Sequence, residues 1–314
     1  MTFNNSDEDT AFYSRIQQTL VYHQGLLRDE LRNKLFYESL KSRVTGETKV
    51  LDIGAGSGVW AIAAARLGAK KVTAIESDEV MIPLIQAHIF ENGFAGKVEI
   101  VHGNSQSINL AEKYDVIISE TIGNQAFDEN IVGTMIDARK RFLADDGVII
   151  PQKITLVAAP VRLAEDVDLP KGLPFQTDCL RNLTRNFTLN LTDKNALEML
   201  GESCKMLEID LREIAAEPDF TNLSAKWNLP DVSRANAVVL WAQAELADGI
   251  NLDSMKTESW LPVVLRFKPF ALKTGEIELN LNANPTNYQW TLRAADEPPQ
   301  TYSPYFTFER LKIG

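Results

Sequence analysis

The chain reads Leu51-Asp52-Ile53-Gly54-Ala55-Gly56-Ser57-Gly58 at its most informative point. An apolar run enters three alternate glycines, and a helix-like segment at residues 60–67 follows. Glycine lacks a Cβ, so the backbone can turn sharply there and lie close to a ligand. A dinucleotide-binding loop reads G-x-G-x-x-G, whereas this loop reads G-x-G-x-G. The stretch therefore predicts a strand–turn–helix unit that binds a ligand without a pyrophosphate, with a cofactor site at Asp52, Gly54, Gly56 and Gly58.

A second acidic residue, after Asp52, indicates that the ligand contains a nucleoside. Glu76 ends the next strand pattern, 18 residues after Gly58. A carboxylate at this position can accept hydrogen bonds from both ribose hydroxyls. The alternatives are a purely structural turn and an ordinary solvated carboxylate. Because the turn and the acid occur together, they favour nucleoside binding over both alternatives.

Strand and helix patterns alternate through the first half of the chain. Strands are expected at residues 50–53, 72–75, 98–101, 116–118 and 148–150, and helices at 60–67, 80–91 and 131–142. This alternation predicts an α/β domain with a mainly parallel, Rossmann-like sheet covered by helices on both faces.

The pattern changes after Pro151 to a period of two, as at residues 276–281, which predicts half-buried antiparallel strands. We therefore expect an N-terminal helical segment (1–45), a Rossmann-like domain (46–151) and a β-rich domain (152–314) that is a barrel or a sandwich.

Composition excludes several classes of function. The formal net charge of -11 argues against a nucleic-acid partner and is compatible with a cationic one. The apolar stretches are shorter than the about 20 residues of a membrane-spanning helix. The two cysteines and three histidines lack zinc-site spacing, so we expect no metal and a reduced, cytoplasmic location.

Two carboxylates, Glu120 and Glu129, bracket the loop that follows the fourth expected strand. A hairpin at Gly123 would bring them together at the edge of the sheet where ligands bind. Paired carboxylates repel each other unless a cation neutralises them, and the planar guanidinium fits such a pair best. The loop therefore predicts that Glu120 and Glu129, as candidate catalytic residues, clamp a ligand of the guanidinium type.

These motifs resemble those of the protein arginine N-methyltransferases, a family of class I methyltransferases. Its acidic loop has the spacing of Ser119, Glu120, Gly123 and Glu129, and its preceding helix resembles residues 23–32. The resemblance implies S-adenosyl-L-methionine as the cofactor. It also implies that Arg32 binds the cofactor's carboxylate and that His23 lies near the ribose.

The resemblance extends to other parts of the chain. It implies that the segment 1–45 covers the cofactor and that the second half, 152–314, is a barrel-like substrate domain. It also suggests a homodimer, with a dimerisation arm at about residues 165–205. Gln106, after the third expected strand, is a candidate for the adenine edge.

The sequence also departs from the family pattern. The family usually has Thr-His-Trp in a loop of the barrel, whereas this chain has Glu258-Ser259-Trp260. Trp260 is expected to wall the acceptor channel beside Ser259, and Asp29 loses its usual histidine partner. Thr121 and Asn124 replace a tryptophan and a tyrosine, which makes the acceptor pocket smaller and more polar.

Three functions follow from these observations. The first is methylation of arginine in a protein or peptide, and the second is methylation of a small guanidine or amine, which the polar loop favours. The third is a non-enzymatic scaffold that binds the cofactor, and the two retained glutamates argue against it.

Overall fold

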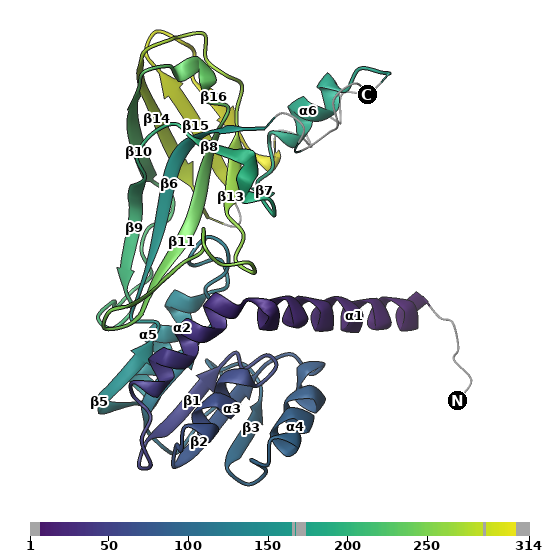
Figure 1. Ribbon diagram of the computed structural model, residues 1–314, viewed down its shortest axis with the longest axis vertical. Coiled ribbons are helices and arrows are strands. Elements are labelled where there is room, and N and C mark those ends of the chain that lie inside the picture. The colour runs from purple at the N-terminus through teal and green to yellow at the C-terminus, as the bar shows by residue number, and fades with distance from the viewer. Residues whose placement is uncertain (1–6, 165–166, 168–173, 285–286, 306–314) are drawn as a thin grey trace.

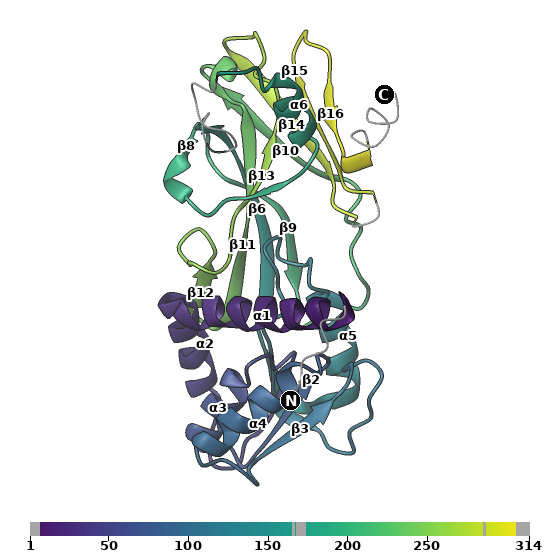
Figure 2. The ribbon, with the colours of Figure 1, turned by 90° about the vertical axis from the view of Figure 1, so that its right-hand side faces the viewer.

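The computed structural model describes residues 7–164, 167, 174–284 and 287–305. The chain begins with two helices, α1 (Asp7–Arg28) and α2 (Glu30–Lys41). Figure 1 shows α1 as a long helix at the junction of two domains, and Figure 2 shows that it runs across this junction. Asp29 separates the helices and caps α2, because its carboxylate accepts the backbone N–H of Arg32.

The first domain is built on a five-stranded parallel sheet in the order β3-β2-β1-β4-β5. Its strands are β1 (Lys49–Ile53), β2 (Lys71–Glu76), β3 (Val98–His102), β4 (Tyr114–Ser119) and β5 (Leu143–Ile150). Its helices are α3 (Val59–Arg66), α4 (Met81–Glu91) and α5 (Ile131–Phe142). The predicted parallel α/β sheet is confirmed.

The strand order creates the place for a site. From β1 the chain proceeds through β2 to the edge strand β3, and it then returns to pair β4 with the other side of β1. The last residues of these central strands, Ile53 and Ser119, lie directly opposite each other. Parallel sheets bind ligands at such a switch point, outside the carboxyl ends of the strands.

The second domain consists of two antiparallel sheets. One contains β6 (Lys153–Leu163), β7 (Leu189–Asn190), β8 (Leu197–Met199), β9 (Cys204–Asp210), β11 (Ala237–Ala247), β12 (Ile250–Asp253) and β13 (Val263–Arg266). The other contains β10 (Leu223–Leu229), β14 (Gly275–Asn282), β15 (Gln289–Ala294) and β16 (Gln300–Tyr302). Three short helices, α6 (Asp178–Thr184), η1 (Lys194–Ala196) and η2 (Val232–Arg234), lie on the connections. The β-rich domain is thus confirmed, and within the described ranges its strands form no closed barrel.

Alternating side chains bury one face of each sheet. Along β14, the residues Ile277, Leu279 and Leu281 are buried and face the same core as Leu240 of β11. A separate core fills the first domain and continues over Ile154 and other residues at one end of β6, β9 and β11. This shared core fixes one domain against the other.

The expected dimerisation arm is described only in part, because residues 165–166 and 168–173 lie outside the described residues. The described α6 projects from the β-rich domain (Figure 1). Its association with a second copy stays a prediction. No helix in the described ranges is long and apolar enough to cross a membrane.

Candidate active site

A cavity of about 240 Å³ lies at the carboxyl ends of β1, β2 and β4. Four segments of the chain form it: the helices α1 and α2, the glycine loop with the start of α3, the end of β2, and the loop after β4. Among the predicted site residues, it is lined by His23, Arg32, Gly54, Gly56, Glu76, Glu120 and Glu129. The structure therefore brings most of the candidate residues together.

The glycine loop lets other groups approach the cavity closely. Gly54 and Gly56 have φ angles of 72° and 53°, in the left-handed region that favours glycine. A Cβ on Gly56 would lie 2.5 Å from the His23 ring, and one on Gly54 would lie 2.7 Å from the Thr121 side chain. The loop thus closes tightly against α1 and against the loop after β4.

Glu76 is held in one orientation by the backbone. One carboxylate oxygen accepts the N–H of Gly56 and the other accepts the N–H of Asp78, both at 2.7 Å. The side chain is buried at the end of β2. Each oxygen keeps a lone pair, so the carboxylate can accept further hydrogen bonds from a ligand in the cavity.

Arg32 is a buried cation at the centre of the site. Its guanidinium forms an ion pair with Glu120 and donates to the Asn33 side chain at 2.8 Å. It also lies over the rings of Phe36 and Trp60, at 5.7 and 5.6 Å. Within the described part of the chain, its buried Nε has no hydrogen-bond acceptor. A buried donor without an acceptor favours an anionic ligand beside it.

Glu120 connects both domains. One of its oxygens pairs with Arg32, and the other accepts the indole N–H of Trp260 at 2.8 Å. Trp260 itself is buried in the core that the two domains share. Neither Trp260 nor Ser259, the two residues predicted to border the acceptor, lines this cavity. Trp260 lies behind it and acts on the site through its hydrogen bond to Glu120.

The Ser259 hydroxyl takes the place of the histidine that usually pairs with Asp29 in the family that the sequence resembles. One Asp29 oxygen accepts the Ser259 hydroxyl at 2.7 Å and the N–H groups of Glu258 and Ser259, both at 2.8 Å. Burial alone raises the pKa of Asp29, but these bonds and that from Arg32 N–H leave the pKa lowered. An ionised Asp29 therefore ties the helices to the loop that carries Trp260.

Glu129 completes the acidic pair. Desolvation, followed by repulsion from Glu120 and Asp128, raises the pKa of Glu129 to about 7. The Tyr22 hydroxyl of α1 donates to Glu129 at 3.4 Å, and this bond acts in the opposite direction on the pKa. Near neutral pH, Glu129 is therefore poised between its neutral and charged forms.

Sequence reasoning missed Tyr22. The residue lines the cavity beside His23. Its only signal in the sequence is its place next to His23 on a helix, and the partner Glu129 lies 107 residues away.

Burial lowers the pKa of His23, so that this ring is neutral near pH 7.

Three predicted cofactor residues do not line the cavity. Asp52 is fully buried and accepts the N–H of Ala61 at 3.0 Å, so it anchors the start of α3. Burial raises its pKa to about 7. Gly58 precedes α3 in a left-handed conformation, and Gln106 is exposed between β3 and β4.

Asn124 serves a structural purpose. Its side-chain oxygen accepts the N–H of Leu261 at 2.8 Å, which fastens the loop after β4 to the loop that carries Trp260. Thr121, in contrast, lines the cavity. Only one of the two polar replacements therefore changes the cavity wall.

We expect Gly56→Ala to weaken binding of S-adenosylhomocysteine. The new methyl group would require a left-handed alanine and would overlap the His23 ring, so the loop and α1 must separate. Isothermal titration calorimetry would measure the loss, expected to be about tenfold or more. Gly46→Ala, where a Cβ meets nothing within 4 Å, is the control. Equal affinities of both variants would contradict the close packing.

A parallel sheet in this order, a glycine loop and an acid at the end of β2 form a Rossmann-like fold of the kind that class I methyltransferases have. A family model described as "Ribosomal protein L11 methyltransferase (PrmA)" matches residues 33–154. Relatives found in sequence comparison include protein arginine N-methyltransferases, which confirms the predicted resemblance.

A probable protein arginine N-methyltransferase 6 of Arabidopsis thaliana is 28% identical over 215 residues, which are 68% of this chain and 46% of that protein. Protein arginine N-methyltransferase 6 of Danio rerio is 27% identical over 230 residues, 68% of this chain and 64% of that protein. The chain thus matches less than two thirds of the length of these relatives.

Among solved structures, the Trypanosoma brucei PRMT1 enzyme–prozyme heterotetrameric complex with AdoHcy is similar. It has a TM-score of 0.74 and 20% sequence identity, and the match covers 89% of this chain and 96% of that chain. The likeness confirms the combination of a Rossmann-like domain with a β-rich domain.

Proposed function

We propose that this protein transfers a methyl group from S-adenosyl-L-methionine to a guanidinium nitrogen of arginine in a protein or peptide. The observation that carries the proposal is that Glu120 and Glu129 line the same cavity as the glycine loop and Glu76. The names of the sequence relatives support the same activity.

The residues present fit the cofactor. Among the residues that the structure describes, none accepts a hydrogen bond from the buried Nε of Arg32, which suits the carboxylate of an amino acid. Glu76 is buried and backbone-oriented, which suits ribose hydroxyls. The close approach of His23 and Thr121 to the glycines leaves a narrow cradle. When bound, the cofactor supplies a methyl group on a positively charged sulfur.

The acidic pair positions the acceptor. A guanidinium between Glu120 and Glu129 can donate to both carboxylates, which orients it and draws its positive charge from the attacking nitrogen. Orientation is the main contribution to an in-line displacement. Trp260 fixes one Glu120 oxygen and Tyr22 contacts Glu129. The methylated nitrogen loses its proton readily, so we assign no general base.

A transfer assay with a labelled methyl group tests the proposal. The acceptors are arginine peptides, the same peptides with citrulline in place of arginine, and free guanidino compounds. Label in the arginine peptides supports the proposal. Label confined to the small molecules would replace it with small-molecule methylation, which the polar Thr121 in the cavity wall favours. Cofactor binding without transfer to any of them would leave a scaffold.

The proposed activity is expected to fall on the acidic side of neutrality. Guanidinium binds the ionised pair, and the pKa of Glu129 is raised to about 7, so kcat/KM should decrease below pH 7 by about tenfold per pH unit. Tyr22→Phe removes a hydrogen bond that favours ionisation of Glu129, so the decrease in kcat/KM should begin at a higher pH. The control is Tyr13→Phe, on the same helix but outside the cavity lining. If kcat/KM decreased at the same pH in the wild type, Tyr22→Phe and Tyr13→Phe, the role of Tyr22 would be refuted.

We also propose a cytoplasmic homodimer that binds no nucleic acid. The net charge of -11 argues against a nucleic-acid partner. Cys179 and Cys204 are both free, which suits a reducing compartment such as the cytoplasm. The projecting α6 supports the arm as the dimer contact.

A further inference from the structure

The loop after β4 ends in a tight turn that contains Glu129. The N–H of Asn130 donates to the carbonyl oxygen of Phe127 at 3.2 Å, so Glu129 lies inside a four-residue turn that begins at Phe127. Ala126, before the turn, and Asn130, at its end, have φ angles of 70° and 63°, in the left-handed region. Residues with a side chain keep such angles where surrounding contacts hold them. The direction of the Glu129 side chain therefore depends on what holds Phe127.

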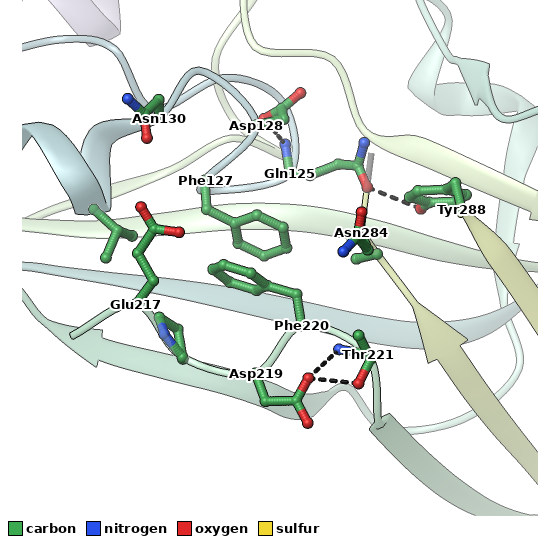
Figure 3. A pocket seen from close by; sticks show the side chains of 13 residues that line it. Gln125, Phe127, Asp128, Asn130, Glu217, Asp219, Phe220, Thr221, Asn284 and Tyr288 are labelled. Atoms are coloured by element: carbon green, nitrogen blue, oxygen red, sulfur yellow. Dashed lines mark hydrogen bonds between the residues drawn. The ribbon is translucent and has the colours of Figure 1, made fainter. Parts of the chain in front are cut away.

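The side chain of Phe127 is held by the second domain. Its ring stacks on that of Phe220, in the connection between β9 and β10, with ring centroids 4.2 Å apart and an interplanar angle of 25° (Figure 3). Both rings are half-buried, and each packs against the core of the second domain and the core that the two domains share. Aromatic rings at this separation attract each other beyond the effect of the area that they bury. The stack therefore attaches the turn to the β-rich domain.

The connection that carries Phe220 is itself fixed in place. Near its start, Arg139 of α5 donates to the backbone oxygens of Leu211 and Ile214, at 2.6 and 2.5 Å. Near its end, the carbonyl oxygen of Phe220 accepts the N–H of Ala283, the residue after β14, at 2.8 Å. Phe220 is thus a fixed surface on which the ring of Phe127 rests.

A second contact holds the same loop further from the acid. The Tyr288 hydroxyl donates to the side-chain oxygen of Gln125 at 2.8 Å, and the N–H of Gln125 donates to Asp128 at 2.9 Å (Figure 3). Gln125 lies four residues before Glu129, whereas Phe127 lies two residues before it. The stack is therefore the nearer of these two attachments to the acidic side chain.

The position of Glu129 also sets its protonation. Desolvation is the first cause that raises its pKa to about 7, and repulsion from Glu120 and Asp128 follows. The bond from Tyr22 of α1 and the cation of Arg32 in α2 oppose these effects. A turn that moved outward would expose Glu129 to water and separate it from Glu120, so the pKa would fall toward its ordinary value. The pKa of Glu129 is therefore a measure of where the turn lies.

We propose that Phe220 is a positioning residue for the acidic pair, because its stack with Phe127 holds the turn that directs Glu129 toward Glu120. The inference rests on the proposed function, in which the two carboxylates hold the acceptor guanidinium. The β-rich domain then holds each acid through one aromatic residue, since Trp260 donates to Glu120. Small displacements of groups that orient a reactant reduce the rate strongly.

The pH dependence of methyl transfer to an arginine peptide by the full chain tests this inference. Phe220→Leu removes the stack and keeps an apolar side chain. Well above the pKa of Glu129, its kcat/KM should be lower by about tenfold, because the acceptor is held less well. The decrease in kcat/KM on acidification should begin at a lower pH than in the wild type, while the affinity for S-adenosylhomocysteine stays nearly unchanged. Phe220→Tyr keeps the ring and should retain the wild-type rate and pH profile.

Two further variants separate the stack from general effects on the fold. Phe127→Leu removes the same stack from the loop, so it should reproduce the change and replaces Phe220→Leu if that variant does not fold. The double variant should lose no more activity than either single variant. Phe90→Leu is the matched control, because Phe90 is exposed on α4 and lies outside the cavity lining. Its kinetics should equal those of the wild type.

An unchanged rate and pH profile in Phe220→Leu would overturn the inference, and so would a lower melting temperature with an unchanged pH profile. A loss in Phe220→Tyr as large as that in Phe220→Leu would also overturn it. Carbon NMR of the Glu129 carboxyl measures its pKa without any transfer. If that pKa fell in Phe220→Leu although the wild type methylated no arginine peptide, the proposed function alone would be wrong.

Discussion

Glu120→Gln is expected to lower kcat/KM for methyl transfer by about 100- to 1,000-fold while the affinity for S-adenosylhomocysteine stays nearly unchanged. The amide removes the negative charge that orients and polarises the guanidinium. Its carbonyl oxygen can still accept a hydrogen bond from Arg32 or from Trp260, the two partners of Glu120. Steady-state kinetics and calorimetry on the same preparation measure the two effects.

The matched control is Glu79→Gln, because Glu79 is exposed close to the end of β2 and lies outside the cavity lining. Its kinetics should equal those of the wild type. If Glu120→Gln reduced cofactor affinity as much as transfer, Glu120 would belong to the cofactor site. If Glu120→Gln retained full transfer, the proposal that Glu120 holds the guanidinium would be wrong.

Asp29→Ala is expected to lower the free energy of unfolding by about 3 kcal/mol, the largest loss among the variants proposed, and to reduce methyl transfer. The buried carboxylate accepts the N–H groups of Arg32, Glu258 and Ser259 and the hydroxyl of Ser259. Alanine removes these acceptors and the helix cap together. The loop that carries Trp260 then loses its attachment to the helices.

Urea unfolding measures the stability change, and Asp193→Ala is the control. Asp193 also caps a short helix through one backbone N–H, but it is exposed, so its loss should be about 1 kcal/mol. Asp29→Asn should lie between the wild type and Asp29→Ala. Stability of Asp29→Ala equal to that of the control would refute the tie between helices and loop.

Local patterns predicted the first domain well because its elements are short, periodic and consecutive. The expected helix at residues 131–142 is α5 with the same bounds, and the expected strand at 50–53 lies within β1. The division of the second half into two sheets was not predicted. It depends on pairings such as those of β6 with β11, which are far apart in sequence.

The same distinction applies to the site. The acidic loop and Glu76 carry local signals, because a strand end and a glycine turn precede them. The contacts of Asp29 with Ser259 and of Tyr22 with Glu129 span 230 and 107 residues, and no periodic pattern encodes them. Asp52 shows the opposite case: its place beside the glycines suggested a ligand contact, yet burial directs its carboxylate to the start of α3.

A crystal structure of the protein with S-adenosylhomocysteine and an arginine peptide tests the central claim most directly. We expect the guanidinium to lie between the carboxylates of Glu120 and Glu129, with the nucleoside over the glycine loop and its ribose on Glu76. A guanidinium elsewhere, or the two carboxylates directed away from each other around an empty space, would contradict the account.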